Sequence, residues 1–150
     1  MDYLQILQKQ KEEALALFDK NKGIAKDFML KNNISRVVIE FDGNGDSGQV
    51  DSVSFQDENE EDTDVNHTPC QMFERTARWF GEEHSRELVE VTSNAEALFI
   101  EMAYSMLEAK HSGWEINEGS FGAIIIKADG TGVMEYNERV EAVNTSVDLF

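Results

Sequence analysis

The sequence is poor in cysteine, proline and basic residues: its 150 residues include one Cys, one Pro and 13 Lys and Arg. Because Cys70 is alone, the chain cannot form an internal disulfide, and we expect a cytoplasmic protein. The N-terminal residues 1–11 are polar and mixed in charge, which predicts no secretory signal. No run of about 18 apolar residues is present, so we expect no membrane-spanning helix. Few clustered bases argue against direct contact with nucleic acid or an anionic membrane.

Acidic residues, by contrast, are abundant: 30 of them give a formal net charge of −17. The apolar fraction of 41% is large enough for a core, and the length suits one domain over residues 1–150. The charge is uneven, since residues 37–73 hold ten acids and no Lys or Arg. Six of those acids lie between Asp57 and Asp64, where mutual repulsion predicts an extended, solvated acidic loop over residues 56–67.

The first 33 residues have the apolar spacing of helices. Leu4, Leu7, Ala14, Leu15 and Phe18 share one stripe. The cations and glycine of residues 20–23 predict an interruption, with a second short helix over residues 24–29.

A hairpin is expected next. Residues 37–41 are β-branched and aromatic, and residues 50–55 alternate in polarity, with Val53 and Phe55 on the buried face. The segment Asp42–Gly48 is rich in Gly, Asn and Asp, which predicts a long connecting turn.

The middle of the chain reads as a helix followed by a strand. Thr68 is placed as N-cap, Pro69 as first helical residue and Gln71 as capping-box partner of a helix that ends at Gly81. Residues 86–91 fit either a strand or a helical turn, and a short strand is favoured.

The C-terminal part predicts a core helix and a second hairpin. Ser93 and Glu96 form a capping box before a wide apolar face that runs to about Lys110. Strands over residues 121–127 and 133–136 are joined at Asp129-Gly130, and an edge strand follows within residues 137–150. The whole is an α+β domain, with helices packed on one face of an antiparallel sheet of about four or five strands.

Several short motifs suggest sites, and each has a structural interpretation. The Asp42–Gly48 segment has acids at calcium-loop spacing, but Ser47 and Val53 stand where such a loop needs Gly and Glu. Gly45-Asp46-Ser47-Gly48 matches a serine-protease nucleophile segment over only four residues. His67 and Cys70 lack a second ligand pair, while His84 and His111 are isolated and are expected at the surface. We expect no cofactor and no bound metal.

The stretch from Gly113 to Gly122 combines glycines, aromatic residues and acids. Its glycines predict a tightly folded connection, which Trp114 and Phe121 would attach to the core. Glu115 and Glu118, with Asp46, would suit a small metal-dependent enzyme if they converged in a cleft.

Three segments together resemble an uncharacterised family of small acidic proteins of bacteria, phages and mobile elements. They are Gly45-Asp46-Ser47-Gly48-Gln49, the glycine-rich stretch Gly113-Trp114-Glu115-x-Asn117-x-Gly119-x-x-Gly122, and Tyr136-Asn137-Glu138-Arg139. The resemblance covers mainly residues 36–50 and 95–140. It implies an accessory role, including phage–host conflict, and implies no catalytic residue.

Charge and resemblance together favour a protein-binding protein that imitates nucleic-acid charge and blocks a basic, nucleic-acid-binding host protein. A structural or assembly subunit, with homo-oligomers, and the small enzyme remain the alternatives. The expected partner-binding residues are Asp57, Glu58, Glu60, Glu61, Asp62, Asp64, Asp42, Asp46, Asp51, Trp114, Glu115 and Glu118.

Overall fold

The computed structural model describes residues 2–44, 47–80, 83–112, 114, 119–139 and 144–150. Within these residues the chain forms two helices and seven strands, so the α+β class is confirmed. The elements in chain order are α1 (Tyr3–Lys31), β1 (Arg36–Asn44), β2 (Ser47–Gln56), β3 (Pro69–Phe80), β4 (Glu83–Asn94), α2 (Ala95–Lys110), β5 (Ser120–Lys127), β6 (Gly132–Glu138) and β7 (Asn144–Leu149).

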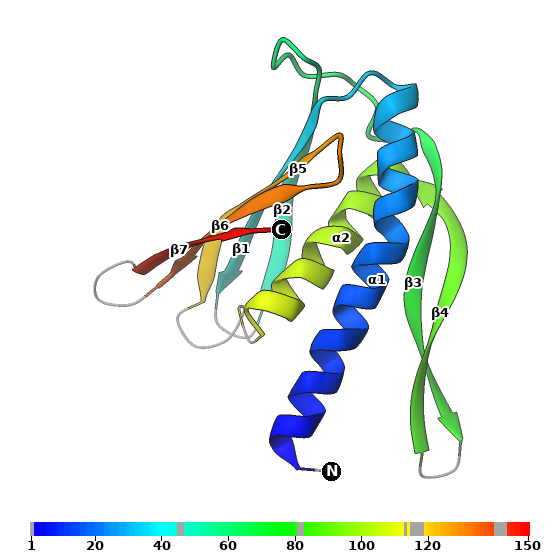
Figure 1. Cartoon of the computed structure of the whole chain (residues 1–150), viewed down its shortest axis with the longest axis vertical. Coiled ribbons are helices and arrows are strands. Elements are labelled where there is room, and N and C mark those ends of the chain that lie inside the picture. Colours follow the sequence, from blue (N-terminus) through cyan, green and yellow to red (C-terminus); the bar gives the residue numbers. More distant parts are fainter. Residues whose placement is uncertain (1, 45–46, 81–82, 113, 115–118, 140–143) are drawn as a thin grey trace.

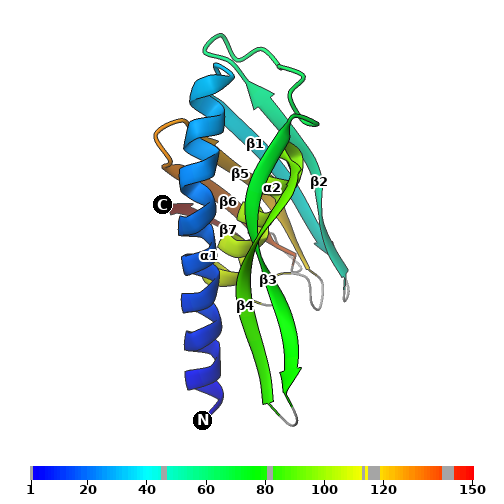
Figure 2. The ribbon, with the colours of Figure 1, turned by 90° about the vertical axis from the view of Figure 1, so that its right-hand side faces the viewer.

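Five strands form one sheet in the order β2-β1-β5-β6-β7, and every neighbouring pair is antiparallel. Strands β3 and β4 form a separate antiparallel ribbon. Helix α2 lies on one face of the five-stranded sheet, and α1 and the ribbon lie beyond α2 (Figures 1 and 2). The expectation of helices on one face of an antiparallel sheet is therefore confirmed.

Helix α2 is the centre of the core because it is buried both toward the sheet and toward α1. Its side chains Leu98, Phe99 and Met102 are inaccessible to solvent. Phe99 meets Phe55 of β2 and Phe28 of α1 edge to face, with ring centroids 5.3 and 6.2 Å apart. A single aromatic cluster thus joins the sheet to both helices.

Helix α1 is continuous, so the predicted interruption at residues 20–23 is wrong. An interior glycine costs a helix about 1 kcal/mol, but the burial of Asn21 before Gly23 and of Ala25 after it outweighs that cost. Asn21 is fully buried, and its side-chain amide donates to the Phe73 carbonyl (3.0 Å) and accepts from the Phe73 N–H (2.7 Å). The first turn runs past the core instead, leaving Leu4 74% exposed rather than on a buried stripe.

The predicted helix over residues 68–81 is also wrong, because Pro69–Phe80 is strand β3. Every residue of β3 has a partner in β4, from Pro69 opposite Asn94 to Phe80 opposite Glu83. A proline is tolerated as the first residue of an edge strand, where no ladder hydrogen bond is lost. The predicted strand at residues 86–91 is confirmed, within the longer β4.

The β1–β2 hairpin is confirmed, with Val53 and Phe55 buried as expected. Its predicted turn, however, is mostly strand: Gly43 pairs with Gly48 and Asn44 with Ser47, leaving residues 45–46 outside the described part.

The C-terminal predictions hold with small shifts. Asn94 caps α2 in place of Ser93, with its side chain accepting from the Ala97 N–H. The turn between β5 and β6 places Gly130 at φ +87°, and the Asp129 carboxylate accepts from the Thr131 N–H. No helix among the described residues is long and apolar enough to cross a membrane.

A carboxylate cluster surrounds Arg75 of β3 where the ribbon meets the helices. Its guanidinium contacts Glu108 of α2 and, at 3.8 Å, Glu13 of α1. Glu101 of α2 lies nearby; burial raises its pKa above the ordinary 4.5, and the Arg75 charge offsets only part of this effect. The ionised form of Glu101 is therefore disfavoured in the folded protein.

Asn21→Ala is expected to lower the free energy of unfolding by about 2–3 kcal/mol, since it removes both hydrogen bonds to Phe73 and leaves two backbone groups unpaired. Chemical denaturation measures the loss. Asn59→Ala, at an exposed asparagine, is the matched control and should change stability by less than about 0.5 kcal/mol. Equal effects of the two variants would contradict this role of Asn21.

Glu101→Gln is expected to stabilise the protein at neutral pH. A raised carboxyl pKa means that the folded state loses stability as pH rises above 4.5, and the neutral amide avoids that loss. Melting temperatures of both proteins, measured from neutral to acidic pH, should converge as Glu101 becomes protonated in the folded and unfolded states. An advantage that persists unchanged in acid would show that ionisation is not its cause.

Candidate partner-binding site

The acidic segment between β2 and β3 begins with a closed, hydrogen-bonded turn. The Asp57 carboxylate accepts from the backbone N–H groups of Asn59 (2.8 Å) and Glu61 (3.1 Å). The backbone closes the same turn, because Asp57 donates to the Glu61 carbonyl and Glu60 donates to the Asp57 carbonyl. The expectation of an extended loop is therefore wrong at its first residues, although their side chains are largely exposed as predicted.

Further contacts attach this turn to the sheet. Asp62 forms a β-bridge with Gln56, and the Thr63 N–H donates to the Phe55 carbonyl at 2.7 Å. Arg36 of β1 donates to the Gln56 side chain and pairs with Glu60 at 3.7 Å. Repulsion among the carboxylates is thus opposed by local hydrogen bonds and one guanidinium, and the charges are held on a defined backbone.

A cleft of about 640 Å³ lies beside the turn, where α1 ends and β1 begins. Its apolar side chains include Leu30, which is 79% exposed. Its charged side chains are three carboxylates and one ammonium group. The lining consists of Lys26, Asp27, Met29, Leu30, Asn33, Ile34, Ser35, Asp57, Glu58, Asn59 and Ala128.

This composition suits a ligand with both cationic and apolar parts. Asp27, Asp57 and Glu58 give the cleft a net negative charge in spite of Lys26. A Lys or Arg side chain of a ligand would meet carboxylates, while an apolar side chain beside it would contact Leu30. Among the described residues, no group of three or more His, Cys, Asp and Glu is arranged to hold a metal ion.

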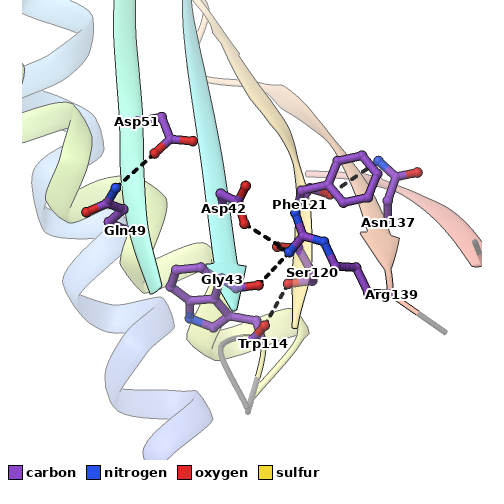
Figure 3. Close-up of polar contacts among 9 residues, drawn as sticks. All are labelled: Asp42, Gly43, Gln49, Asp51, Trp114, Ser120, Phe121, Asn137 and Arg139. Atoms are coloured by element: carbon purple, nitrogen blue, oxygen red, sulfur yellow. Dashed lines mark hydrogen bonds and ion pairs between the residues drawn. The ribbon is translucent and has the colours of Figure 1, made fainter. Parts of the chain in front are cut away.

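Asp42 and Asp51, two other acids predicted to bind the partner, lie away from the acidic turn. Both lie toward the other end of the β1–β2 hairpin (Figure 3). Asp42 is opposite Gln49, and eight further residues of β2 and the turn bring the chain to Asp57, a separation of about 25 Å. The predicted partner-binding residues that the structure describes therefore do not form one continuous surface.

Asp42 is also neutralised, by a residue that the sequence reasoning did not single out as functional. The Arg139 guanidinium pairs with the Asp42 carboxylate at 2.9 Å and donates to the Gly43 carbonyl at 2.7 Å and the Ser120 carbonyl at 3.2 Å (Figure 3). It also lies over the Phe121 ring, 4.9 Å from its centroid. Its position as one of two bases in residues 111–150 was the available signal.

Trp114 is buried, so its assignment to partner binding is corrected. Its ring packs edge to face on Phe41 and is stacked with Tyr104, and its carbonyl accepts from the Ser120 hydroxyl at 2.7 Å (Figure 3). Trp114 packs in the core as expected, whereas Phe121 lies under Arg139 instead.

The three segments that carry the family resemblance meet, as far as they are described, at the end of the sheet near Arg139. Gly122 lies where a Cβ would collide with the Glu135 carbonyl and the Phe41 ring, so strand packing requires glycine there. Asp46, Glu115 and Glu118 lie outside the described residues. Their convergence, which the enzyme hypothesis needs, stays a prediction.

The remaining candidates have structural surroundings. His111 is half-buried rather than at the surface; it contacts Asp148 at 2.7 Å and stacks on Tyr136 with ring centroids 3.7 Å apart. Cys70 belongs to β3 rather than to a helix, and burial raises the pKa of its thiol, which disfavours the reactive thiolate.

A match to a known protein family covers most of the chain. A model described as a family of unknown function (DUF6878) matches residues 17–150. The chain belongs to this family. The DUF6878 match includes the sheet, the ribbon, α2 and the part of α1 from Leu17 onward. Neither the curated proteins nor the solved structures contain a significant match.

Asp57→Ala is expected to lower the free energy of unfolding by about 1 kcal/mol, because two backbone N–H groups lose their acceptor. Asp57→Asn retains an acceptor oxygen and should lose less than half of that amount. Glu58→Ala, a neighbouring carboxylate on the same turn, is the charge-matched control. If Asp57→Ala and Glu58→Ala have the same effect in urea denaturation, the carboxylate does not organise the turn.

Proposed function

We propose that the chain is a protein-binding module that takes a basic segment of a partner protein at the acidic turn and the cleft beside it. The observation that carries this proposal is the placement of Asp57 and Glu58 on a hydrogen-bonded turn, at the rim of a cleft that also contains exposed Leu30. Carboxylates on an ordered backbone lose less conformational entropy on binding than carboxylates on an extended loop.

Long-range electrostatics supports the same partner chemistry. A formal charge of −17 attracts cationic proteins and repels acidic ones, and it raises association rates with a strong dependence on salt. At the cleft, direct contacts with the carboxylates and with Leu30 would add to this general attraction. One apolar side chain against Leu30 would give the site a preference among basic partners.

The class of partner that we propose is a nucleic-acid-binding protein, since such proteins carry clustered Lys and Arg for phosphate contacts. Six carboxylates between residues 57 and 64 provide a dense line of negative charge of the kind such a surface recognises. With the resemblance to phage and mobile-element proteins, this supports an inhibitor that occupies the basic surface of a host protein.

Affinity capture from a host lysate tests the proposal with two variants of equal charge. The cleft variant is Asp27→Asn, Asp57→Asn and Glu58→Gln, in which the amide oxygen introduced by Asp57→Asn retains the turn's acceptor. The control removes three exposed carboxylates elsewhere, by Glu12→Gln, Asp19→Asn and Glu90→Gln. Basic proteins captured by the wild type at low salt should fall about tenfold or more with the cleft variant, and should be released at high salt.

The control variant should capture the same proteins at nearly wild-type levels. Capture that is unchanged in the cleft variant, or reduced equally in both variants, would contradict binding at the cleft. Absence of any captured basic protein at low salt would contradict the protein-binding function itself.

A further inference from the structure

The five-stranded sheet has a second face that no described helix or strand covers (Figure 1). Alternate residues of each strand point away from α2. In β5, Ile124 and Ile126 are buried under the helix, whereas Ile125 between them is only partly buried. In β7, Asp148 contacts His111, the C-cap residue of α2, so Val147 and Leu149 point the other way and are 61% and 82% exposed.

The strand register assembles an apolar row on this face. Val38 of β1 is opposite Ile125 of β5, Ile125 is opposite Val133 of β6, and Val133 is opposite Leu149 of β7. Four neighbouring strands therefore contribute one apolar side chain each, at successive spacings of about 4.8 Å. We call Val38, Ile125, Val133 and Leu149 the apolar row.

Charges of opposite sign flank the apolar row. On one side of the apolar row, two residues further along each strand, the register places Glu40, Ala123 and Glu135 next to one another. Two residues in the other direction, it places Arg36 beside Lys127. Glu40, Glu135 and Lys127 are exposed, and Arg36 is half-buried. Each flanking row lies about 7 Å from the apolar row.

This face is complementary to itself. If the sheets of two copies of the chain face each other, a two-fold axis parallel to the apolar row and midway between the sheets relates them. Such an axis places each apolar row on its copy and exchanges the two flanking rows. Arg36 of one chain then faces Glu40 of the second chain. Lys127 of one chain faces Ala123 of the second chain and lies between Glu40 and Glu135 of that second chain.

We infer that the open face of the five-stranded sheet is a homodimer interface, in which the apolar row packs against the same row of a second copy of this chain. This interface shares only Arg36 with the contacts of the acidic turn, where Arg36 pairs with Glu60, and it does not depend on the proposed function. The facing area is roughly 500 Å² per chain, from strand spacing and rise, which corresponds to a weak dimer.

The net charge of −17 does not prevent this association at physiological ionic strength. The Debye length there is about 8 Å, so charges distant from the interface are largely screened. On the two rows that flank the apolar row, two glutamates are matched by two bases. Of the acidic turn, Glu60 lies next to this region because it pairs with Arg36, so Lys127 is the base on the flanking rows that a second copy can pair with freely.

Sedimentation equilibrium of the full chain tests the inference, over about 1–500 μM at about 0.15 M salt, a range suited to an interface of this size. The fraction of wild-type dimer should increase with protein concentration, and Leu149→Asp should raise the dimer dissociation constant at least tenfold. Leu4→Asp is the matched control at a leucine of similar exposure on α1, and should leave the dimer unchanged. Both sites are exposed, so neither substitution should impair folding.

A charge exchange identifies the arrangement of the two chains. Lys127→Glu and Glu135→Lys should each weaken the dimer, and the double variant should restore it to within about threefold of wild type. Within one chain, four residues of strand separate the two rows, about 13 Å, so only contact with the second copy explains such rescue. A wild type that stays monomeric, a dimer disrupted by Leu4→Asp but not by Leu149→Asp, or no rescue in the double variant would overturn the inference.

Discussion

The burial of α2 on two opposite sides is the constraint on which the rest of the structure depends. A helix whose apolar residues surround most of its circumference must be covered twice. The five-stranded sheet covers one side, and α1 with the β3–β4 ribbon covers the other. This arrangement leaves the far face of the sheet open, and it places the end of α1 beside the acidic turn that follows β2.

The two surfaces that carry our proposals follow from this arrangement. The cleft exists because α1 ends beside the turn at Asp57, where helix, strand and turn residues meet. The apolar row exists because one layer of helices can cover only one face of a sheet. One surface is acidic and suited to a foreign cationic partner, while the other is balanced in charge and suited to a second copy of the chain.

The sequence predicted the parts of the fold that local pattern determines. Strands β1, β2, β5 and β6, the turn at Asp129-Gly130 and the core helix α2 all follow from short-range periodicity and turn chemistry. Strand β3 was missed because the Thr68-Pro69 start has a helix signature, and because its attachment to α1, through Asn21 and Phe73, joins residues that are distant in the sequence. The same limit applies to the site: acidic residues 57–64 stood out in the sequence, but the cleft combines segments around Leu30, Asp57 and Ala128.

The proposed function depends on recognition of a cationic partner at the acidic turn, which hydrogen exchange with a captured basic partner can detect. Backbone amides of residues 26–35 and 57–61, which include the cleft lining, should exchange more slowly in the complex than in the free protein. Unchanged exchange in both segments, with protection elsewhere on the molecule, would show that the partner does not bind at the acidic turn.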